Sequence, residues 1–413
     1  MKIGFLYDAV YPWVKGGGEK TLYELACELR DRGHECHFFG MHCWDGPPDI
    51  ERDGLHYHAV CPNVPLYGSD GKRRMSQPLR FAWGVLRQLR RYDLNSFDLF
   101  DVHAFPFFSV PAFWFVRLIR ARRLPWLLTW LEVWGRDYWR RYLGAKGIVG
   151  AGLERWCAWI APHHLCISPT TGRRLEQLLG VDAKRISVIP RGFVATSGAL
   201  PAGRRDPLKV VVAGRLISYK QVDLALRAWT SVVEALNGAH LHVIGDGPEA
   251  TNLRQLQANL DLAESVSLHG QLARSEDVLE AIASAALLLQ PSLREGQSTV
   301  VLEALTLGTP VLAAIGPETA VGDFLGDEST TSAARLPEDA TPAAWAERIV
   351  TLLRDDQART ALVDAGRRQV AQLGWREFIA PQVEALYHQL VDANACERRP
   401  AGTRLHSDRP SRR

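Results

Sequence analysis

Short apolar runs alternate with helical patterns from one end of this chain to the other. In the first half we expect these runs to form strands, near residues 3–7, 35–39, 56–60, 97–102, 126–131, 163–167 and 186–189. Helical patterns lie between them: in residues 19–31 leucines recur at helical spacing, and Gly33 follows as a stop. Strands that alternate with helices are typical of βα units on a parallel sheet.

The pattern breaks at residues 192–207, which have no periodicity and concentrate Gly, Pro and Arg, so we expect an interdomain linker there. Further apolar runs follow at 208–214, 241–247, 266–270, 286–292 and 309–314. Because single cores stop growing near ~250–300 residues, we expect two Rossmann-like α/β domains, residues 1–191 and 208–372. A helix over 373–396 and a disordered basic tail over 397–413 complete the expected organisation.

Charge and cysteine content exclude several classes of protein. The net charge is +3, and the tail holds six arginines against two acids, so the remainder is close to neutral and a nucleic-acid binder is not expected. The seven cysteines form no Cys-x-x-Cys pair, which disfavours a disulfide framework and a zinc ribbon. The most apolar run, residues 105–116, is too short to span a bilayer, and the first residues do not resemble a signal peptide. We therefore expect a cytoplasmic protein.

Two glycine-rich turns are candidate anion sites. Gly16, Gly17 and Gly18 directly precede a helix, where backbone N–H groups and the helix dipole favour a phosphate; a plain strand-to-helix turn explains them equally well. The spacing is not Gly-x-Gly-x-x-Gly, which removes the main support for a nicotinamide dinucleotide. In the second half, Gly214 begins a turn that carries Arg215 and Lys220. Both cations suit a diphosphate, although solvated charges at a helix start explain this turn more simply when it is taken alone.

A carboxylate pair is the most informative feature. Glu295 follows a buried strand, and Glu303 lies eight residues later in a helix expected to start near Gln297, on the order of 10 Å away. Between them the helix start offers the N–H groups of Ser298 and Thr299. A diol at Glu303, a diphosphate at the helix start and a polyhydroxyl group at Glu295 together describe a nucleotide sugar. The alternatives are a helix-surface glutamate and a loop glutamate that stabilises the helix start, but the apolar neighbours of Glu303 argue against the first.

Taken together, these motifs resemble those of the retaining glycosyltransferases of family 4, which have the GT-B fold. The resemblance covers about residues 1–395 and rests on four motifs in order: the glycines before Glu19, the turn from Gly214 to Lys220, the turn from Gly245 to Pro248, and the stretch from Glu295 through Glu303 to Val311. It implies a nucleotide-diphosphate sugar held mainly by the second domain, with an acceptor bound by the first.

The resemblance also implies roles for single residues. Arg215 and Lys220 would hold the diphosphate, Glu303 the ribose hydroxyls, and Glu295 would lie beside the transferred sugar. It implies transfer of a hexosyl-type sugar with retention of configuration, without a metal or other cofactor, and the chain contains no Asp-x-Asp triplet.

Some positions depart from the family pattern. Leu131 stands where related enzymes carry a histidine beside the donor sugar, and His103 is the candidate for an imidazole in the same cleft, with simple packing as its alternative. Arg191 and Gln297 also replace common family residues. The departure at Leu131 motivates a second hypothesis, a catalytically impaired homologue that binds nucleotide sugar as a partner or regulator; a Rossmann-type oxidoreductase is a third.

Residues 72–92 combine arginines and Lys72 with Leu79 and Trp83. This composition suits an interfacial helix that contacts the inner face of a membrane. The alternative, an ordinary amphipathic helix with a charged solvent face, is favoured because Pro78 and Gly84 weaken the helix.

Overall fold

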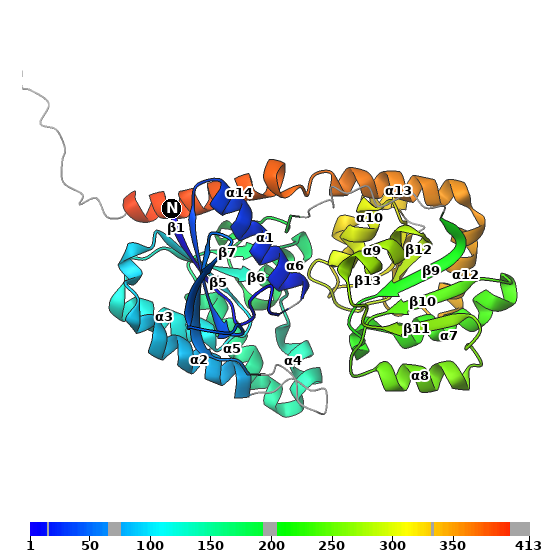
Figure 1. Ribbon diagram of the computed structural model, residues 1–413, viewed down its shortest axis with the longest axis horizontal. Helices are drawn as coiled ribbons and strands as arrows, with labels where there is room; N and C mark the ends of the chain where they lie inside the picture. Colours follow the sequence, from blue (N-terminus) through cyan, green and yellow to red (C-terminus); the bar gives the residue numbers. More distant parts are fainter. Residues whose placement is uncertain (15, 65–75, 193–204, 332–333, 397–413) are drawn as a thin grey trace, which may run out of the picture.

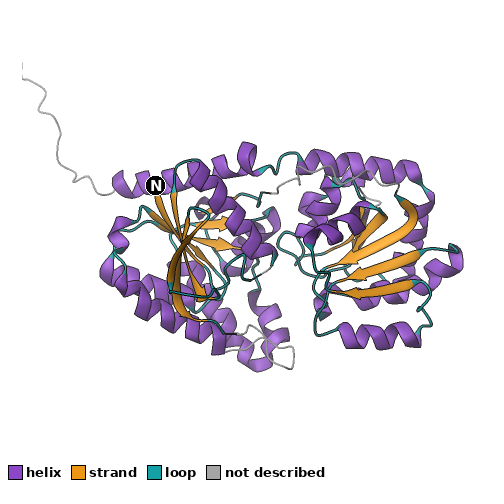
Figure 2. Ribbon diagram, in the orientation of Figure 1, coloured by secondary structure: helices purple, strands orange, loops and turns teal. Residues whose placement is uncertain are grey.

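The computed structural model describes residues 1–14, 16–64, 76–192, 205–331 and 334–396. They form two α/β domains that lie side by side, each built on a twisted sheet with helices on its faces (Figures 1 and 2). The expected two-domain architecture is therefore confirmed. Most of the expected linker and all of the expected disordered tail lie outside the described residues.

The first domain contains an eight-stranded sheet in the order β3-β4-β2-β1-β5-β6-β7-β8. Its strands and main helices are β1 (Lys2–Leu6), α1 (Gly17–Asp31), β2 (Glu35–His42), β3 (Asp49–Arg52), β4 (Leu55–Pro62), α2 (Ser76–Gln88), β5 (Leu99–His103), α3 (Ser109–Arg120), β6 (Trp126–Trp130), α4 (Gly135–Leu143), α5 (Gly147–Ile160), β7 (His164–Cys166), α6 (Pro169–Leu179) and β8 (Ile186–Val188). All seven expected strands are present. The strand missed from the sequence, β3, is a mostly exposed edge strand that pairs antiparallel with β4, so it lacks the apolar signal of a buried strand.

The second domain contains a six-stranded parallel sheet in the order β11-β10-β9-β12-β13-β14. Its elements are β9 (Asp206–Ala213), the 3₁₀ turn η5 (Ser218–Lys220), α7 (Val222–Ala235), β10 (His240–Ile244), α8 (Ala250–Asn259), β11 (Val266–Gly270), α9 (Ser275–Ala283), β12 (Ala285–Gln290), α10 (Thr299–Thr306), β13 (Val311–Ile315), α11 (Glu328–Thr331), β14 (Arg335–Pro337), α12 (Pro342–Arg354) and α13 (Asp356–Val370). The five expected strands are present, whereas the three-residue β14 was missed. Helix α10 begins at Thr299, two residues later than expected.

The two faces of the first sheet have separate apolar cores. One core lies under α1 and the C-terminal helix, and it includes Phe5, Phe38 and Leu127. The other lies under α2, α3 and α5, and it includes Phe39 and Phe100. Burial on both faces explains why the central strands read as continuous apolar runs rather than as an alternating pattern.

The chain crosses back to the first domain at its end. After α13, the π-helical turn η8 (Trp375–Ile379) and α14 (Ala380–Cys396) pack on α1 and cover the first sheet (Figure 1). The Tyr387 hydroxyl donates to Asp101 Oδ2 at 2.6 Å, and Trp375 Nε1 donates to Glu24 at 3.0 Å. The last helix therefore ties the two domains together.

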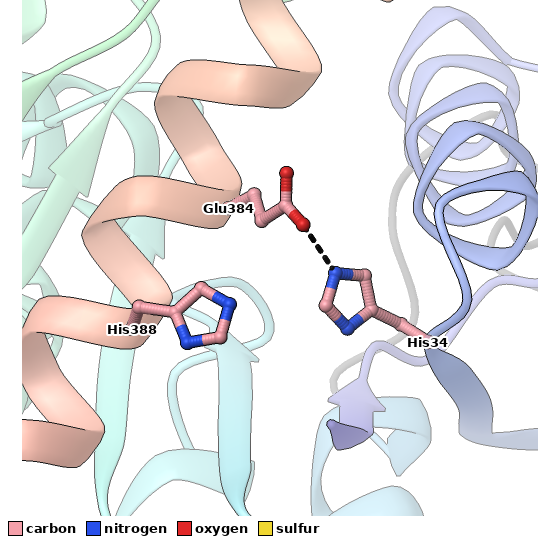
Figure 3. A group of neighbouring side chains, drawn as sticks. All are labelled: His34, Glu384 and His388. Carbon is pink, nitrogen blue, oxygen red and sulfur yellow. Dashed lines mark hydrogen bonds and ion pairs between the residues drawn. The ribbon is translucent and has the colours of Figure 1, made fainter.

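A polar cluster fastens α14 to the first sheet (Figure 3). His34 Nε2 lies 2.8 Å from Glu384 Oε1, and His388 is placed one helical turn further along α14. The other carboxylate oxygen of Glu384 accepts a hydrogen bond from Arg32 Nε at 2.6 Å, and His34 Nδ1 lies 3.0 Å from the amino group of Met1. Glu384 is thus held by two donors of the first domain. Among the described helices, none is long and apolar enough to cross a membrane.

Candidate functional site

Loops of the two domains meet between the sheets. A Cβ atom on Gly17 would lie 3.1 Å from Thr299 Oγ1, at the start of α10, and one on Gly18 would lie 3.4 Å from Leu131 Cδ1. On the other side, a Cβ atom on Gly296 would lie 1.9 Å from the carbonyl oxygen of Leu131. Of the three glycines expected before the helix, only Gly16 precedes it, since α1 begins at Gly17. The glycine-rich start of α1, the segment after β6 and the segment around the start of α10 are therefore in contact. Side chains larger than hydrogen are excluded at the closest of these approaches.

Two of the three positions expected to depart from the family pattern, Arg191 and Gln297, bind each other across this junction. The backbone N–H of Arg191 donates to Gln297 Oε1 at 2.8 Å, and Gln297 Nε2 donates to the Arg191 carbonyl at 3.1 Å. The side chain of Arg191 reaches the glycine loop, since its Nη1 would lie 3.5 Å from a Cβ on Gly18. This reciprocal pair joins the end of the first domain to the start of α10.

Glu295 and Lys220 form an ion pair between two mostly buried side chains. Gln290 Nε2 also donates to Glu295 Oε1 at 2.6 Å. The backbone of Glu295 is fixed as well, because its carbonyl accepts from the Ala320 N–H at 2.7 Å. The expected acid and the expected diphosphate-binding cation are thus in direct contact, in a rigid setting at the carboxyl end of β12.

Glu303 has a different environment. It lies on α10 and is largely buried, and among the described residues its carboxyl group has no hydrogen bond or ion pair. Burial raises the pKa of Glu303 from 4.5 to about 7; the charge of Lys20 opposes this shift, and that of Glu24 adds to it. Lys20 and Glu24 belong to α1, so Glu303 faces the first domain. A buried carboxyl group without a partner is costly unless a ligand supplies donors.

The turns at Gly214 and Gly245 are packed backbone to backbone. Both glycines have positive φ angles, 141° and 139°, and a Cβ on Gly245 would lie 1.9 Å from the carbonyl oxygen of Gly214. A side chain is therefore excluded at Gly245 by conformation and by space. Arg215 follows directly after Gly214 and is exposed.

His103 lies deeper, at the end of β5. It is 2% exposed and stacks on Tyr7 with ring centroids 4.5 Å apart. Among the described residues neither of its ring nitrogens has a hydrogen-bond partner. Burial, with a contribution from Arg191, places the pKa of His103 well below 6.5, so the ring is neutral. It lines a cavity of about 30 Å³ together with Asp101 and Arg191, which is room for about one water molecule.

Arg294 is a site feature that the sequence analysis missed. Its guanidinium lies 4.1 Å from the ring centroid of Tyr138, 4.6 Å from that of Tyr219 and 5.1 Å from that of Trp134. Its Nε is 3.0 Å from Glu132 Oε2, and the residue is only 7% exposed. Trp134, Tyr138 and Glu132 belong to the first domain, so this cation fixes the loop that carries Glu295 against the segment that follows Leu131.

The second domain touches the first through the segment after β13 as well. The backbone N–H of Thr170, at the start of α6, donates to Asp323 Oδ2 at 2.8 Å. Arg174 Nη1 donates to the Pro317 carbonyl at 3.0 Å, and Arg141 forms an ion pair with Glu318. Glu295 pairs with this same segment, at Thr319. Contacts between the domains therefore converge on the backbone that holds the Glu295 carboxylate.

Comparison with known proteins identifies the family. Residues 15–196 match the model of glycosyltransferase family 4, and residues 207–355 match that of glycosyl transferases group 1. Alpha-monoglucosyldiacylglycerol synthase of Streptococcus pneumoniae is 34% identical over 331 residues, which cover 76% of this chain and 71% of the synthase. D-inositol 3-phosphate glycosyltransferase of Kineococcus radiotolerans is 29% identical over 248 residues. That match spans 55% of this chain and 57% of the relative, so the chain matches little more than half of that protein's length.

Solved structures show the same architecture. Sucrose-phosphate synthase of Thermosynechococcus elongatus superimposes with a TM-score of 0.75 at 20% identity, over 95% of this chain and 99% of its own. HepE of Anabaena, solved in complex with UDP and glucose, superimposes with a TM-score of 0.68 at 20% identity, over 94% and 100%. The chain therefore belongs to the family 4, group 1 glycosyltransferases and has the GT-B fold.

Proposed function

We propose that this protein transfers a hexosyl-type sugar from a nucleotide-diphosphate donor to an acceptor hydroxyl with retention of configuration. The observation that carries the proposal is the order in which charged groups lie around the start of α10. Glu303, on α10, has a buried carboxyl group without a partner among the described residues, and the Lys220–Glu295 pair lies in the segments before this helix. A ligand with a diol, a diphosphate and a sugar, in that order, supplies what each position lacks.

The ribose of the donor would occupy the Glu303 side. Two vicinal hydroxyls donate two hydrogen bonds to one carboxylate, which stabilises the ionised form that burial disfavours. Among the described residues nothing else bonds to this carboxyl group. A ribose therefore accounts for a group that the unliganded chain leaves unsatisfied.

The diphosphate would lie at the start of α10, within reach of Lys220 and Arg215. On donor binding the ammonium of Lys220 would turn from Glu295 to the phosphate oxygens, and Glu295 would be released to accept hydrogen bonds from sugar hydroxyls. Charge that grows on the leaving diphosphate is then stabilised by cations and by the backbone N–H groups near Thr299. We expect this stabilisation to need no metal ion and no other cofactor.

Retention requires the acceptor oxygen to arrive on the face that the diphosphate leaves. We propose front-face substitution: the bond from the anomeric carbon to the diphosphate oxygen breaks, the bond to the acceptor oxygen forms, and the acceptor proton passes to the departing diphosphate. The protein's part is to orient both partners and to stabilise the developing charge.

Similar proteins support the class of donor that we propose. HepE has been solved with UDP-glucose and with UDP, and the name of the relative alpha-monoglucosyldiacylglycerol synthase denotes a glucosylated product. We therefore place uridine-diphosphate hexoses first among the donors to be tested. The acceptor, whether a glycan, a lipid or a small molecule, is bound by loops of the first domain.

A panel of nucleotide sugars tests the proposal. The full chain is incubated with each donor, nucleotide release is measured, and the melting temperature is recorded with the donor and with the free nucleotide. Release together with thermal protection supports the transferase, and NMR of the product must then show the anomeric configuration of the donor. Inversion of configuration, or protection only by a nicotinamide cofactor, would refute the proposal.

The impaired homologue is the second candidate function, because Leu131, which lies between Gly18 and Gly296, stands where the family resemblance implies a histidine. It predicts protection by the donor without turnover. His103 does not restore an ionisable group at the cleft surface, since it is buried and neutral. Its role as an acid or base stays a prediction, which a pH profile of the His103→Gln variant tests.

A further inference from the structure

Three helices on one face of the first sheet, α2, α3 and α5, leave large apolar side chains uncovered. They pack on the same apolar core; α2 contacts α3, and α3 contacts α5 (Figure 1). Their exposed apolar residues are Leu79 and Trp83 on α2, Phe115, Leu118 and Ile119 on α3, and Ile148, Val149, Trp156 and Trp159 on α5. We call this set the apolar face. Trp83 is 65% exposed and Trp159 is 75% exposed.

The exposed residues recur at helical spacing. On α5 the positions 148, 149, 156 and 159 form a single stripe, and on α3 the positions 115, 118 and 119 form another. In each helix the opposite stripe is buried in the core, for example Val116 in α3 and Cys157 in α5. These helices are therefore apolar on two sides. An ordinary amphipathic helix of a globular domain is apolar only on the side that faces the core.

The three helices that form the apolar face carry an excess of basic residues. Residues 76–92 and 104–123 contain no acidic residue at all. Residues 144–163 contain only Glu154, which is fully buried and accepts hydrogen bonds from Trp139 Nε1 and two backbone N–H groups. Exposed arginines rim the set: Arg80 and Arg87 on α2, Arg90 and Arg91 after it, Arg120 on α3, Arg122 after it, and Arg155 on α5.

From this arrangement we infer that the apolar face is a docking surface for an anionic lipid bilayer. Exposed tryptophans suit the interfacial region of a bilayer, where an apolar ring and an N–H group are both accommodated. Exposed arginines at the rim of an apolar surface are attracted to anionic head groups. An acidic partner protein would satisfy the arginines but not so many tryptophan and aliphatic side chains spread over three helices.

The structure also bears on the expectation that Pro78 and Gly84 weaken a helix in residues 72–92. Gly84 was expected to weaken this helix, yet α2 is formed from Ser76 to Gln88. Gly84 is required by packing, since a Cβ there would lie 2.3 Å from the carbonyl oxygen of Val60 in β4. Residues 72–75, which carry three of the expected cations, lie outside the described residues, and the inference does not use them.

Vesicle binding of the full chain tests the inference without any donor or acceptor, so its outcome is separate from that of the proposed function. The chain is sedimented with vesicles of phosphatidylcholine alone or mixed with phosphatidylglycerol. We expect binding to the mixed vesicles, with a blue shift of tryptophan emission and quenching by brominated lipid. The basic tail contains no tryptophan, so quenching reports the folded domains.

Two double variants separate the contributions. Trp83→Ser with Trp159→Ser should lower the partition coefficient by about tenfold. Arg87→Glu with Arg120→Glu should lower it by about a hundredfold on the mixed vesicles. The matched controls are Phe378→Ser, which changes an exposed aromatic residue of η8, and Arg368→Glu on α13, both away from the apolar face (Figure 1). All four positions of the double variants are exposed, and circular dichroism checks that each variant is folded.

Several outcomes would overturn the inference. These are absence of binding by the native chain, equal binding to neutral vesicles, or full binding by the double variants. A concentration-dependent dimer in analytical ultracentrifugation that the tryptophan variant abolishes would assign the apolar face to a second copy of the chain instead.

Discussion

Glu303 offers the sharpest test of the site, because its ionisation couples stability to ligand binding. Its pKa is raised from 4.5 to about 7, chiefly by burial. At 1.36 kcal/mol per pKa unit this difference corresponds to about 3 kcal/mol. Between these two pH values the folded chain holds a proton that the unfolded chain releases. The free energy of unfolding therefore falls as pH rises through this window, and it stays lower above it.

Glutamine at this position removes the titration and keeps the size of the side chain. The Glu303→Gln variant should exceed the native chain in free energy of unfolding by about 3 kcal/mol at pH 8 but only by about 1 kcal/mol at pH 5. Urea unfolding followed by circular dichroism at the two pH values measures both differences. Glu347→Gln, an exposed change on α12, serves as the control and should show no difference between the two pH values. A gain for Glu303→Gln that is the same at pH 5 and pH 8 would refute the buried, unpartnered carboxyl group.

The same variant should lose nucleotide affinity while it gains stability. Two hydrogen bonds to a charged carboxylate contribute about 1.5–3 kcal/mol each, so at least a tenfold weaker Kd is expected in calorimetry. A ligand that stabilises the ionised form lowers the pKa of Glu303, and the native chain should therefore release a proton on binding near pH 6. Titrations in buffers of different ionisation enthalpy detect this proton. Unchanged affinity together with no proton release in the native chain would place the ribose elsewhere.

Three further substitutions test other parts of the site. Lys220→Ala should lower kcat by about 10²–10³, as expected for loss of one donor to a developing charge, and a change confined to KM would contradict that role. Leu131→His should raise turnover if a missing imidazole limits the reaction. Equal rates for the variant and the native chain would remove the reason for the impaired-homologue hypothesis, which is the absence of a histidine at this position. Gly245→Ala should destabilise the second domain by about 3 kcal/mol or more, measured by thermal unfolding, because the added Cβ overlaps the carbonyl oxygen of Gly214.

The sequence predicted the parts of this structure that depend on local pattern. The order of strands and helices follows from apolar periodicity, and both glycine turns were found because positive φ or close backbone approach demands glycine. Strand β3 was missed because its residues are exposed and polar at a sheet edge. Helix α10 was placed two residues early: its N-cap is Ser298, whose side chain makes no capping hydrogen bond that would mark the start.

Contacts between residues far apart in the chain could not be predicted from the apolar pattern. The helix over 373–396 was expected, but its return to the first sheet depends on Tyr387 reaching Asp101, nearly three hundred residues away. The ion pair of Lys220 with Glu295 was not expected either, because the sequence analysis assigned each residue to a separate part of a ligand. A motif shows which chemical groups are present; it does not show which of them bind each other when the ligand is absent.

Arg294 shows how such a contact bears on the chemistry. It is the neighbour of Glu295 in the chain, yet its side chain is held by Glu132, Trp134 and Tyr138 of the first domain. These residues follow closely after Leu131 in the chain. Replacing Arg294 by a neutral residue would leave the partly buried carboxylate of Glu132 without its counter-charge. The position of Glu295 therefore depends on the first domain as much as on its own loop. A change in the segment after β6 would therefore shift Glu295, and with it the proposed donor site, without contact with the donor; the effect of Leu131 on activity then depends on the contacts of Glu132 and Trp134 as well.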